Sequence, residues 1–177
     1  RADMILRSSD SVDFFILESF LRIISPVFED KCSMNQASNG GVTARSRLPV
    51  MEVGENSRTL HHLLLLIYPY DDQPPLQDAE LFSNVAAAAR KYKMTGIEKK
   101  LEGYLAGSSL MSSEPLLIYA RAISLGWGET AKSAAKSMLS QDLQDMTYVK
   151  GLEYITGMDL QHLMEYRFRC GSAASTV

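Results

Sequence analysis

The chain has 177 residues, of which 46% are apolar and 22% charged, and its formal net charge is −3. This length suits one domain or one domain with an extension, and the composition is that of an ordinary globular protein. The acidic balance, without any run of Lys and Arg, argues against binding to nucleic acid. The longest apolar block, residues 63–68, is far too short to cross a membrane. We find no secretory signal, and we expect an intracellular protein, cytoplasmic or nuclear, that does not contact membranes.

The chain begins with Arg1 instead of Met, so we expect it to be a piece of a longer protein. Its two cysteines, Cys32 and Cys170, are far apart in the sequence. Cysteines of intracellular proteins are usually reduced, and we expect two free thiols here. The alternative is one disulfide that ties the C-terminal end to the second helix.

The N-terminal residues predict a β-hairpin and two helices. Residues 3–8 and 12–16 read as strands, joined by a turn that is rich in Ser and Asp. A first helix should follow, and Ser25-Pro26 should begin a second, because Ser is a good N-cap and Pro is tolerated at the first helical position. The first helix would gather four apolar side chains on one face: Leu17, Phe20, Leu21 and Ile24. We expect nearly all of residues 12–34 to lie in the core.

A loop and a third strand come next. Residues 35–47, rich in Asn, Gly and Ser, predict a mobile loop, and residues 48–53 predict the strand. Pro49 cannot donate to a ladder, so it should stand at the start of that strand or on a sheet edge.

Three helices follow in the middle of the chain. Ser57 should cap the first, and Pro69 should end it before a rigid loop over residues 70–75. Thr95 and Glu98 form a capping box that should open the third helix. The positions expected to face inward are Leu60, Leu63, Leu64 and Ile67 in the first helix, Phe82, Val85, Ala86 and Ala89 in the second, and Leu101 and Leu105 in the third.

The pattern becomes entirely helical after a Gly-Ser-Ser stretch that begins at Gly107. We therefore predict an α+β domain over residues 1–107, a helical extension over residues 108–170 and a disordered tail over residues 171–177. Thr156 and Asp159 form a second capping box, which should open the last helix. The residues of that helix expected to face inward are Leu160, Leu163, Met164 and Phe168.

Taken in this order, several blocks resemble the BTB/POZ domain family. They are ADMIL (2–6), FFILESFL (14–21), SPVF (25–28), LLLLIY (63–68) and AAARKYKM (87–94). The C-terminal blocks EPLLIYA (114–120) and LMEYRFRCG (163–171) are similar to the helical tail of uncharacterised BTB-domain proteins from filamentous and mushroom-forming fungi. The resemblance implies an α+β fold, a small three-stranded sheet flanked by helices, followed by the helical extension.

The family resemblance also implies a function in dimerisation and partner binding. Some members of the family recruit transcriptional corepressors through a charged pocket, and others recruit a cullin scaffold for ubiquitin transfer. The pocket would combine Asp3 with a basic residue, but the His-Lys pair usual before the first helix is Leu17-Glu18 here. The family's N-terminal dimer-swapping segment is not found ahead of Arg1, which weakens that mode of dimerisation.

The cullin-binding type carries a hydrophobic-x-Glu motif in the loop after the second helix. The nearest match in place is the triplet Met34-Asn35-Gln36, which has an amide where the motif has a carboxylate. Residues 50–52 have the right letters but belong to the predicted third strand. We therefore keep a cullin-based ubiquitin-ligase adaptor as the alternative function.

Enzymatic chemistry has few candidates. The adjacent pair His61-His62 projects about 100° apart on a helix and chelates one metal poorly, and His162 is distant in sequence. Cys32 with one of these histidines would be a nucleophile and its base, but it stands among core-type residues. A thiol- or metal-dependent hydrolase is therefore the remote alternative.

We predict a non-catalytic protein–protein interaction module that needs no cofactor and no metal. Its partner would be another copy of the chain or a different protein, and burial of apolar surface with aromatic anchors would supply the binding energy. The candidate contact residues are Phe14, Phe20, Phe28, Met34 and Gln36.

Overall fold

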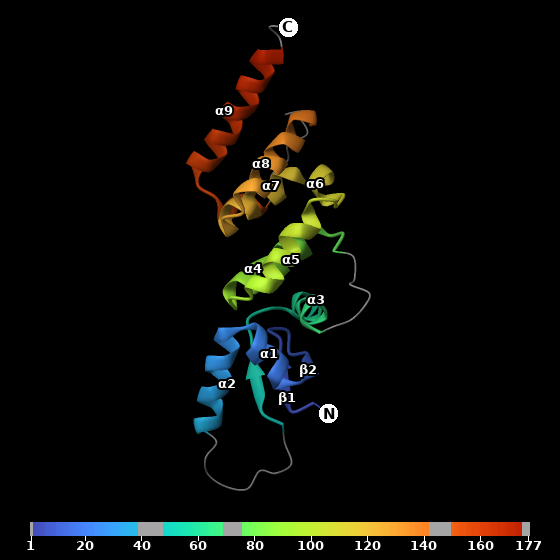
Figure 1. Ribbon diagram of the computed structural model, residues 1–177, viewed down its shortest axis with the longest axis vertical. Coiled ribbons are helices and arrows are strands. Elements are labelled where there is room, and N and C mark those ends of the chain that lie inside the picture. The colour runs from blue at the N-terminus through green and yellow to red at the C-terminus, as the bar shows by residue number, and fades with distance from the viewer. Residues whose placement is uncertain (1, 39–47, 69–75, 142–149, 175–177) are drawn as a thin grey trace. The chain divides into compact units, whose positions relative to one another are not determined.

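A computed structural model describes residues 2–38, 48–68, 76–141 and 150–174 (Figure 1). Two compact units divide the chain, and we describe each by itself. Unit 1 comprises Arg1–Pro75 and Asn84–Lys99, and unit 2 comprises Leu76–Ser83 and Lys100–Val177. These divisions differ from the boundary at residue 107, and the predicted domain limits stay a prediction.

Unit 1 contains a small mixed sheet, so the chain is α+β as predicted. The described strands are β1 (Met4–Arg7), β2 (Asp13–Ile16) and β3 (Val50–Glu52), in the spatial order β2-β1-β3. β1 pairs antiparallel with β2, which confirms the hairpin, and parallel with β3. Pro49 directly precedes β3, an edge strand, and its carbonyl accepts from the Ile5 N–H at 2.9 Å. This is the position expected for a residue without a donor.

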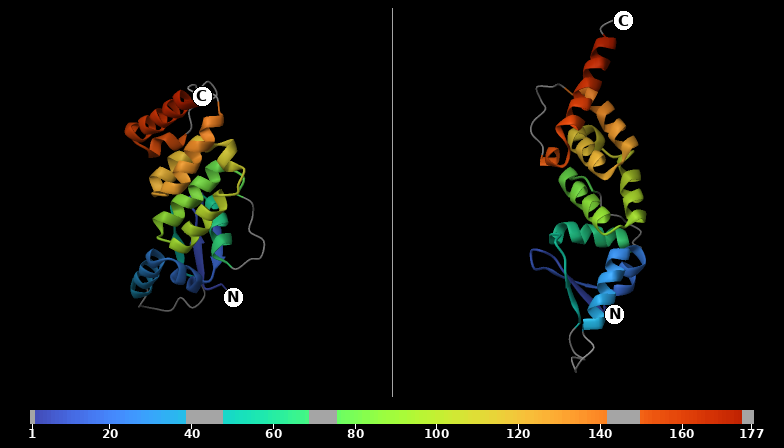
Figure 2. Two further views of the ribbon diagram at one scale, coloured as in Figure 1. Left: turned by 45° about the horizontal axis from the view of Figure 1, so that its top comes forward. Right: turned by 90° about the vertical axis from the view of Figure 1, so that its left-hand side faces the viewer.

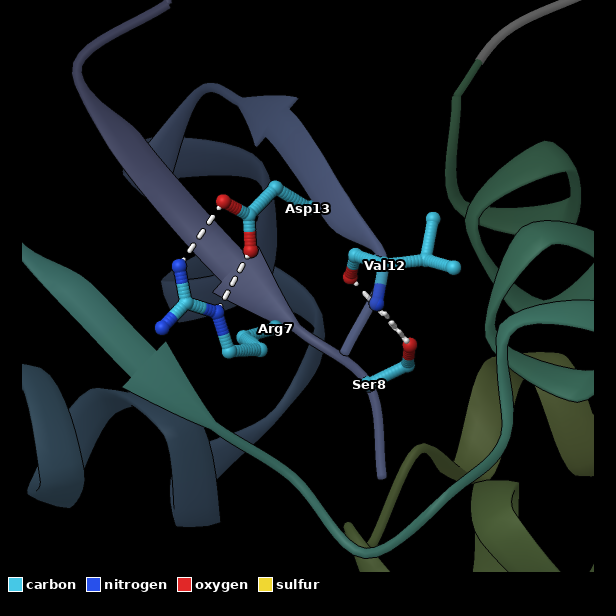
Figure 3. A network of polar contacts seen from close by, with 4 residues as sticks. All are labelled: Arg7, Ser8, Val12 and Asp13. Atoms are coloured by element: carbon cyan, nitrogen blue, oxygen red, sulfur yellow. Dashed lines mark hydrogen bonds and ion pairs between the residues drawn. The ribbon is translucent and has the colours of Figure 1, made fainter. Parts of the chain in front are cut away.

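The hairpin turn is held by side chains at the ends of its two strands (Figure 3). The Ser8 hydroxyl accepts from the Val12 N–H at 3.0 Å and donates to the Val12 carbonyl at 3.2 Å. Arg7 donates twice to the Asp13 carboxylate, at 2.7 and 2.9 Å. These bonds determine which residues of the two strands stand opposite each other.

Two helices, α1 (Glu18–Ile24) and α2 (Pro26–Ser38), follow the hairpin and lie on one side of the sheet (Figure 2). Ser25 caps α2 as predicted, because its hydroxyl accepts from the Phe28 N–H at 3.1 Å. The prediction that this stretch is nearly all core is wrong, since Ile23 is 83% exposed. The predicted loop is also wrong at its start, because α2 continues to Ser38; residues 39–47 lie outside the described part of the chain.

Helix α3 (Ser57–Ile67) begins one residue earlier than predicted. Asn56 is its N-cap, accepting from the Thr59 N–H at 2.8 Å, and Ser57 is the first helical residue. Four apolar residues predicted to face inward are buried: Leu60, Leu63, Leu64 and Ile67. Pro69 and the predicted rigid loop lie outside the described residues.

The start of α3 is tied to the hairpin turn through Asp10. Its carboxylate accepts from the Ser57 N–H at 2.7 Å and from the Ser57 hydroxyl at 2.6 Å. These bonds, with a further one from Ser8, lower the pKa of Asp10 from 3.8 to about 2. A carboxylate at a helix N-terminus also interacts favourably with the helix dipole.

We expect Asp10→Asn to lower the melting temperature at neutral pH, with a deficit that closes in acid. Because the pKa of Asp10 is lower in the folded chain, its contribution is complete above pH 3.8 and is lost as the pH falls towards about 2. Thermal unfolding of both proteins across this range measures the effect. Asp30→Asn, an exposed carboxylate of α2, is the control. A deficit that does not change with pH would contradict this role of Asp10.

Two further helices, α4 (Ala79–Lys91) and α5 (Thr95–Leu105), carry their predicted inward residues into the core. All of these are buried: Phe82, Val85, Ala86, Ala89, Leu101 and Leu105. The predicted capping box at Thr95 is wrong. Thr95 is already helical, Met94 accepts the first bond from the Glu98 N–H at 2.9 Å, and the Glu98 carboxylate pairs with Arg90 at 3.1 Å.

The core of unit 1 is centred on Tyr92. Its ring stacks on Phe28 with 4.4 Å between centroids, and its carbonyl accepts from the buried Ser25 hydroxyl. Its own hydroxyl donates to Glu55, which also pairs with Lys91 at 2.7 Å. Burial and the Glu55 carboxylate both raise the pKa of Tyr92, so it stays neutral and acts as a hydrogen-bond donor.

Unit 2 is helical, as predicted for the C-terminal part. Its further elements are α6 (Leu110–Ser113), α7 (Pro115–Leu125), α8 (Gly128–Ser137), the 3₁₀ helices η1 (Met138–Ser140) and η3 (Lys150–Tyr154), and α9 (Gly157–Ala174). α7 and α8 pack side by side (Figures 1 and 2). Gly126 ends α7 with φ of 71°, a left-handed conformation that favours glycine. Trp127, which follows it, is buried.

Helix α9 agrees with the sequence at its start and differs along its length. The capping box is confirmed, because the Thr156 N–H donates to Asp159 at 2.9 Å and the Asp159 N–H donates to the Thr156 hydroxyl at 3.2 Å. Leu163 is buried, but Phe168 is 77% exposed, so its predicted inward position is wrong. The predicted disordered tail is helical as far as Ala174, and residues 175–177 lie outside the described part.

Candidate protein-interaction surface

The outer face of the sheet carries a row of apolar side chains. Phe15 stands opposite Ile5, and Ile5 stands opposite Val50, so the row crosses all three described strands. Directly opposed residues of neighbouring strands lie on the same face and touch. Phe15 is 66% exposed and Val50 is 43% exposed, whereas Ile5 between them is half-buried. We call Phe15, Ile5 and Val50 the outer row.

A charged row runs beside the outer row on the same face. Asp13 stands opposite Arg7, and Arg7 stands opposite Glu52. The bonds from Arg7 lower the pKa of Asp13, so this carboxylate stays ionised well into acid. An apolar stripe bordered by charges has the composition of an interface core with a polar rim.

The opposite face of the same strands is buried. It carries Met4, Leu6, Ile16 and Met51, all in the core. The alternation between the two faces is the period of two that a half-buried strand requires. The exposed face of a sheet is ordinarily polar, so the apolar outer row is an exception.

A groove of about 350 Å³ lies next to the outer row, along β2 and α3. It is lined by Ala2, Phe14, Phe15, Ile16, Leu17, His61, Leu64, Leu65 and Tyr68. The rings of Phe14 and His61 stack with centroids 6.5 Å apart, and the Tyr68 hydroxyl accepts from the Leu17 N–H at 2.9 Å. Phe15 therefore belongs both to the outer row and to the rim of this groove.

The structure separates the five predicted contact residues. Phe14 lines the groove, and Phe20 is half-buried against Tyr68 with 4.7 Å between ring centroids. Phe28 is completely buried, so its side chain belongs to the core and does not reach a partner. Met34 is 71% exposed on α2, and the side chain of Gln36 lies outside the described part.

The sequence reasoning missed Phe15, Val50 and Ile23 as exposed apolar residues. The sequence did contain a signal for Phe15, because strict alternation along residues 13–16 places it on the face opposite Phe14 and Ile16. The expectation that nearly all of residues 12–34 lie in the core hid this alternation.

Unit 2 has an apolar groove of its own, of about 630 Å³. It is lined by Leu139, Met164, Arg167, Phe168, Cys170, Gly171 and Ala174. Arg167 is occupied within the unit, where it donates to the carbonyls of Met138 and Gln141, the latter at 2.8 Å. Nothing in this groove indicates the chemistry of a ligand.

The residues considered for catalysis are Cys32, His61 and His62. Cys32 is a free thiol in the core, and burial raises its pKa to about 11, which keeps it protonated and a poor nucleophile at neutral pH. His62 is held by its own helix, with Nδ1 2.9 Å from the Arg58 carbonyl. Within the described residues, no three His, Cys, Asp or Glu side chains form a group that could hold a metal ion. Cys170 is also a free thiol.

No protein-family model matches the chain, and no curated protein sequence matches it either. In the part of the chain that the structure describes, every helix is too short or too polar to serve as a membrane span.

Proposed function

We propose that the chain is a non-catalytic protein–protein interaction module of the BTB/POZ type, which binds another copy of itself or a different protein through the sheet of unit 1. The observation that carries the proposal is the outer row, in which Phe15 and Val50 remain exposed on a face that would ordinarily be polar. Large aromatic side chains surrounded by a charged rim are the usual anchors of an interface. The order of strands and helices and the two-helix stretch after the hairpin support the family assignment.

We do not extend the proposal to cullin binding. The triplet Met34-Asn35-Gln36 lies within α2, whereas the family motif belongs to the loop after that helix. The amide of Gln36 also replaces the motif's carboxylate. No observation therefore favours the adaptor function over the general one.

We expect replacement of Phe15 and Val50 together by Ser to weaken complex formation at least about tenfold, since both anchors are lost. Stability should change little, because both side chains are largely exposed. Light scattering over a concentration series measures self-association, and affinity capture followed by binding measurements on the purified partner measures hetero-association. Leu139→Ser removes a comparably exposed apolar residue of unit 2 and is the control.

Two results would overturn this proposal. One is a wild-type chain that forms no complex with itself or with any purified candidate. The other is a complex that binds the double variant as tightly as the wild type.

A further inference from the structure

The outer edge of β2 presents main-chain groups that have no partner strand. β2 is an edge strand of the β2-β1-β3 sheet. The bond from the Ser8 N–H to the Val12 carbonyl, at 3.0 Å, determines which residues of β2 direct their main-chain N–H and C=O groups towards β1. Since antiparallel pairs alternate, Phe14 and Ile16 bond to β1, and the N–H and C=O groups of Asp13 and Phe15 point away from it. The Ile5 N–H agrees with this alternation, because it bonds to Pro49 on the other side of β1.

The open edge ends at Leu17. The next outward N–H along the chain is that of Leu17, and it already donates to the Tyr68 hydroxyl at 2.9 Å. For the outward main-chain groups of Phe15 we find no partner among the described residues. The edge therefore offers two donors and two acceptors, on Asp13 and Phe15, to an incoming strand.

The groove beside this edge is suited to apolar side chains. Among the lining residues that the structure describes, His61 and Tyr68 are the only ones with ionisable side chains, and none carries a carboxylate, an ammonium or a guanidinium group. A charged side chain inside it would lose its hydration without gaining a partner, which is unfavourable. Apolar side chains would instead contact Leu64 and Leu65 of α3 and Tyr68, the C-cap of that helix.

An acidic side chain, Asp3, lies at the end of the groove near Leu17. The carboxylate of Asp3 accepts from the Glu18 N–H at 2.7 Å, and Glu18 itself pairs with Arg22 at 3.3 Å. Asp3 is exposed, so its carboxylate is available to a ligand beside the groove. This end favours a ligand that carries a basic residue.

We propose that the open edge of β2 and its groove bind an extended peptide segment of a partner protein, which joins the sheet as an antiparallel strand. The proposal deepens the proposed function and rests on it. The peptide residue opposite Phe15 exchanges two hydrogen bonds with it and lies on the outer face, where it extends the outer row. Its two neighbours point to the other face and enter the groove. An apolar run preceded by Lys or Arg fits, because the N-terminal end of an antiparallel peptide lies next to Leu17 and the Asp3 carboxylate.

A second copy of the chain fits this edge less well than a peptide does. Two β2 strands that pair antiparallel are related by a two-fold axis normal to the sheet, so both α3 helices would lie on the same face beside one seam. The second α3 would have to share the space of the groove between β2 and α3, which is about 350 Å³. A helix with its side chains is about 10 Å across and does not fit there. A single strand brings only side chains into it.

The test uses Phe15→Pro against Phe15→Thr. Both variants remove the phenyl ring, but only Pro removes the outward N–H, and Pro is tolerated on an edge strand where the N–H faces solvent. Random peptides displayed on phage are selected on the full chain, and the enriched peptides are synthesised and titrated against both variants. We expect binding to Phe15→Pro to be at least about tenfold weaker than binding to Phe15→Thr, and the selected peptides to share an apolar run with a basic residue before it.

Amide hydrogen exchange on the wild-type chain keeps the proposal falsifiable if Phe15→Pro does not fold. The selected peptide should slow exchange of the Phe15 amide at least about tenfold, and leave the Ile5 amide, already bonded to Pro49, nearly unchanged. Equal binding to the two variants, an unprotected Phe15 amide, or no enrichment over a selection on Phe15→Pro would each overturn the proposal. If the chain instead dimerises through the outer row and selects no peptide, the peptide site is overturned and the proposed function stands.

Discussion

Phe28→Ala is expected to lower the free energy of unfolding by about 3–5 kcal/mol, the largest effect among the changes considered. Phe28 is 0% exposed, and its ring stacks on Tyr92 at 4.4 Å in the centre of unit 1. Truncation removes buried apolar surface and the aromatic contact, and it leaves a cavity that close-packed neighbours fill only in part. Urea unfolding followed by far-ultraviolet circular dichroism measures the change.

The matched control for Phe28→Ala is Phe15→Ala, the same substitution at an exposed position of the same unit. Its effect on stability should stay within about 1 kcal/mol, because most of the ring is already in water. Similar losses for the two variants would contradict the assignment of Phe28 to the core and of Phe15 to the surface. The pair of measurements therefore also tests which Phe of the N-terminal stretch is available to a partner.

Ser25→Ala is expected to lower the free energy of unfolding by about 2–4 kcal/mol, a large effect for the loss of one oxygen atom. The hydroxyl of Ser25 caps α2 by accepting from the Phe28 N–H, and loss of such a cap costs about 1 kcal/mol. The same hydroxyl donates to the Tyr92 carbonyl, and an unsatisfied buried carbonyl costs about 1–3 kcal/mol more. Thermal or urea unfolding measures the total.

Ser33→Ala is the control for this second substitution. The Ser33 hydroxyl donates to the Glu29 carbonyl at 2.9 Å, but it is exposed, so water replaces the bond when the hydroxyl is removed. The expected change is within about 0.5 kcal/mol. A loss for Ser25→Ala as small as this would show that the bond to Tyr92 contributes little to stability.

Local chemistry determined much of the architecture from the sequence alone. Three features each depend on residues within a few positions of one another: the hairpin, the start of α2 at Ser25-Pro26 and the Thr156–Asp159 capping box. The buried face of α3 and the α+β class were also readable, because helical and strand periods appear directly in the order of apolar residues.

The predictions of helix caps were wrong where another residue competed for the capping position or for the capping side chain. Asn56 and Ser57 are both good N-caps, and the bonds from Asp10 to Ser57 draw Ser57 into the first turn and leave the cap to Asn56. At Thr95, the predicted partner Glu98 pairs with Arg90 instead. In each case a residue outside the predicted cap decided between local options of similar energy.

The interaction surface depended on tertiary structure for the same reason. The sequence by itself determined that Phe14, Phe15, Phe20 and Phe28 are apolar and regularly placed, but an apolar residue can serve a core or an interface equally well. Only the pairing of β2 with β1, and the packing of α2 on Tyr92, placed Phe28 inside and left Phe15 in water. The open edge of β2 was likewise not readable, because which strand lies at an edge is a property of the assembled sheet.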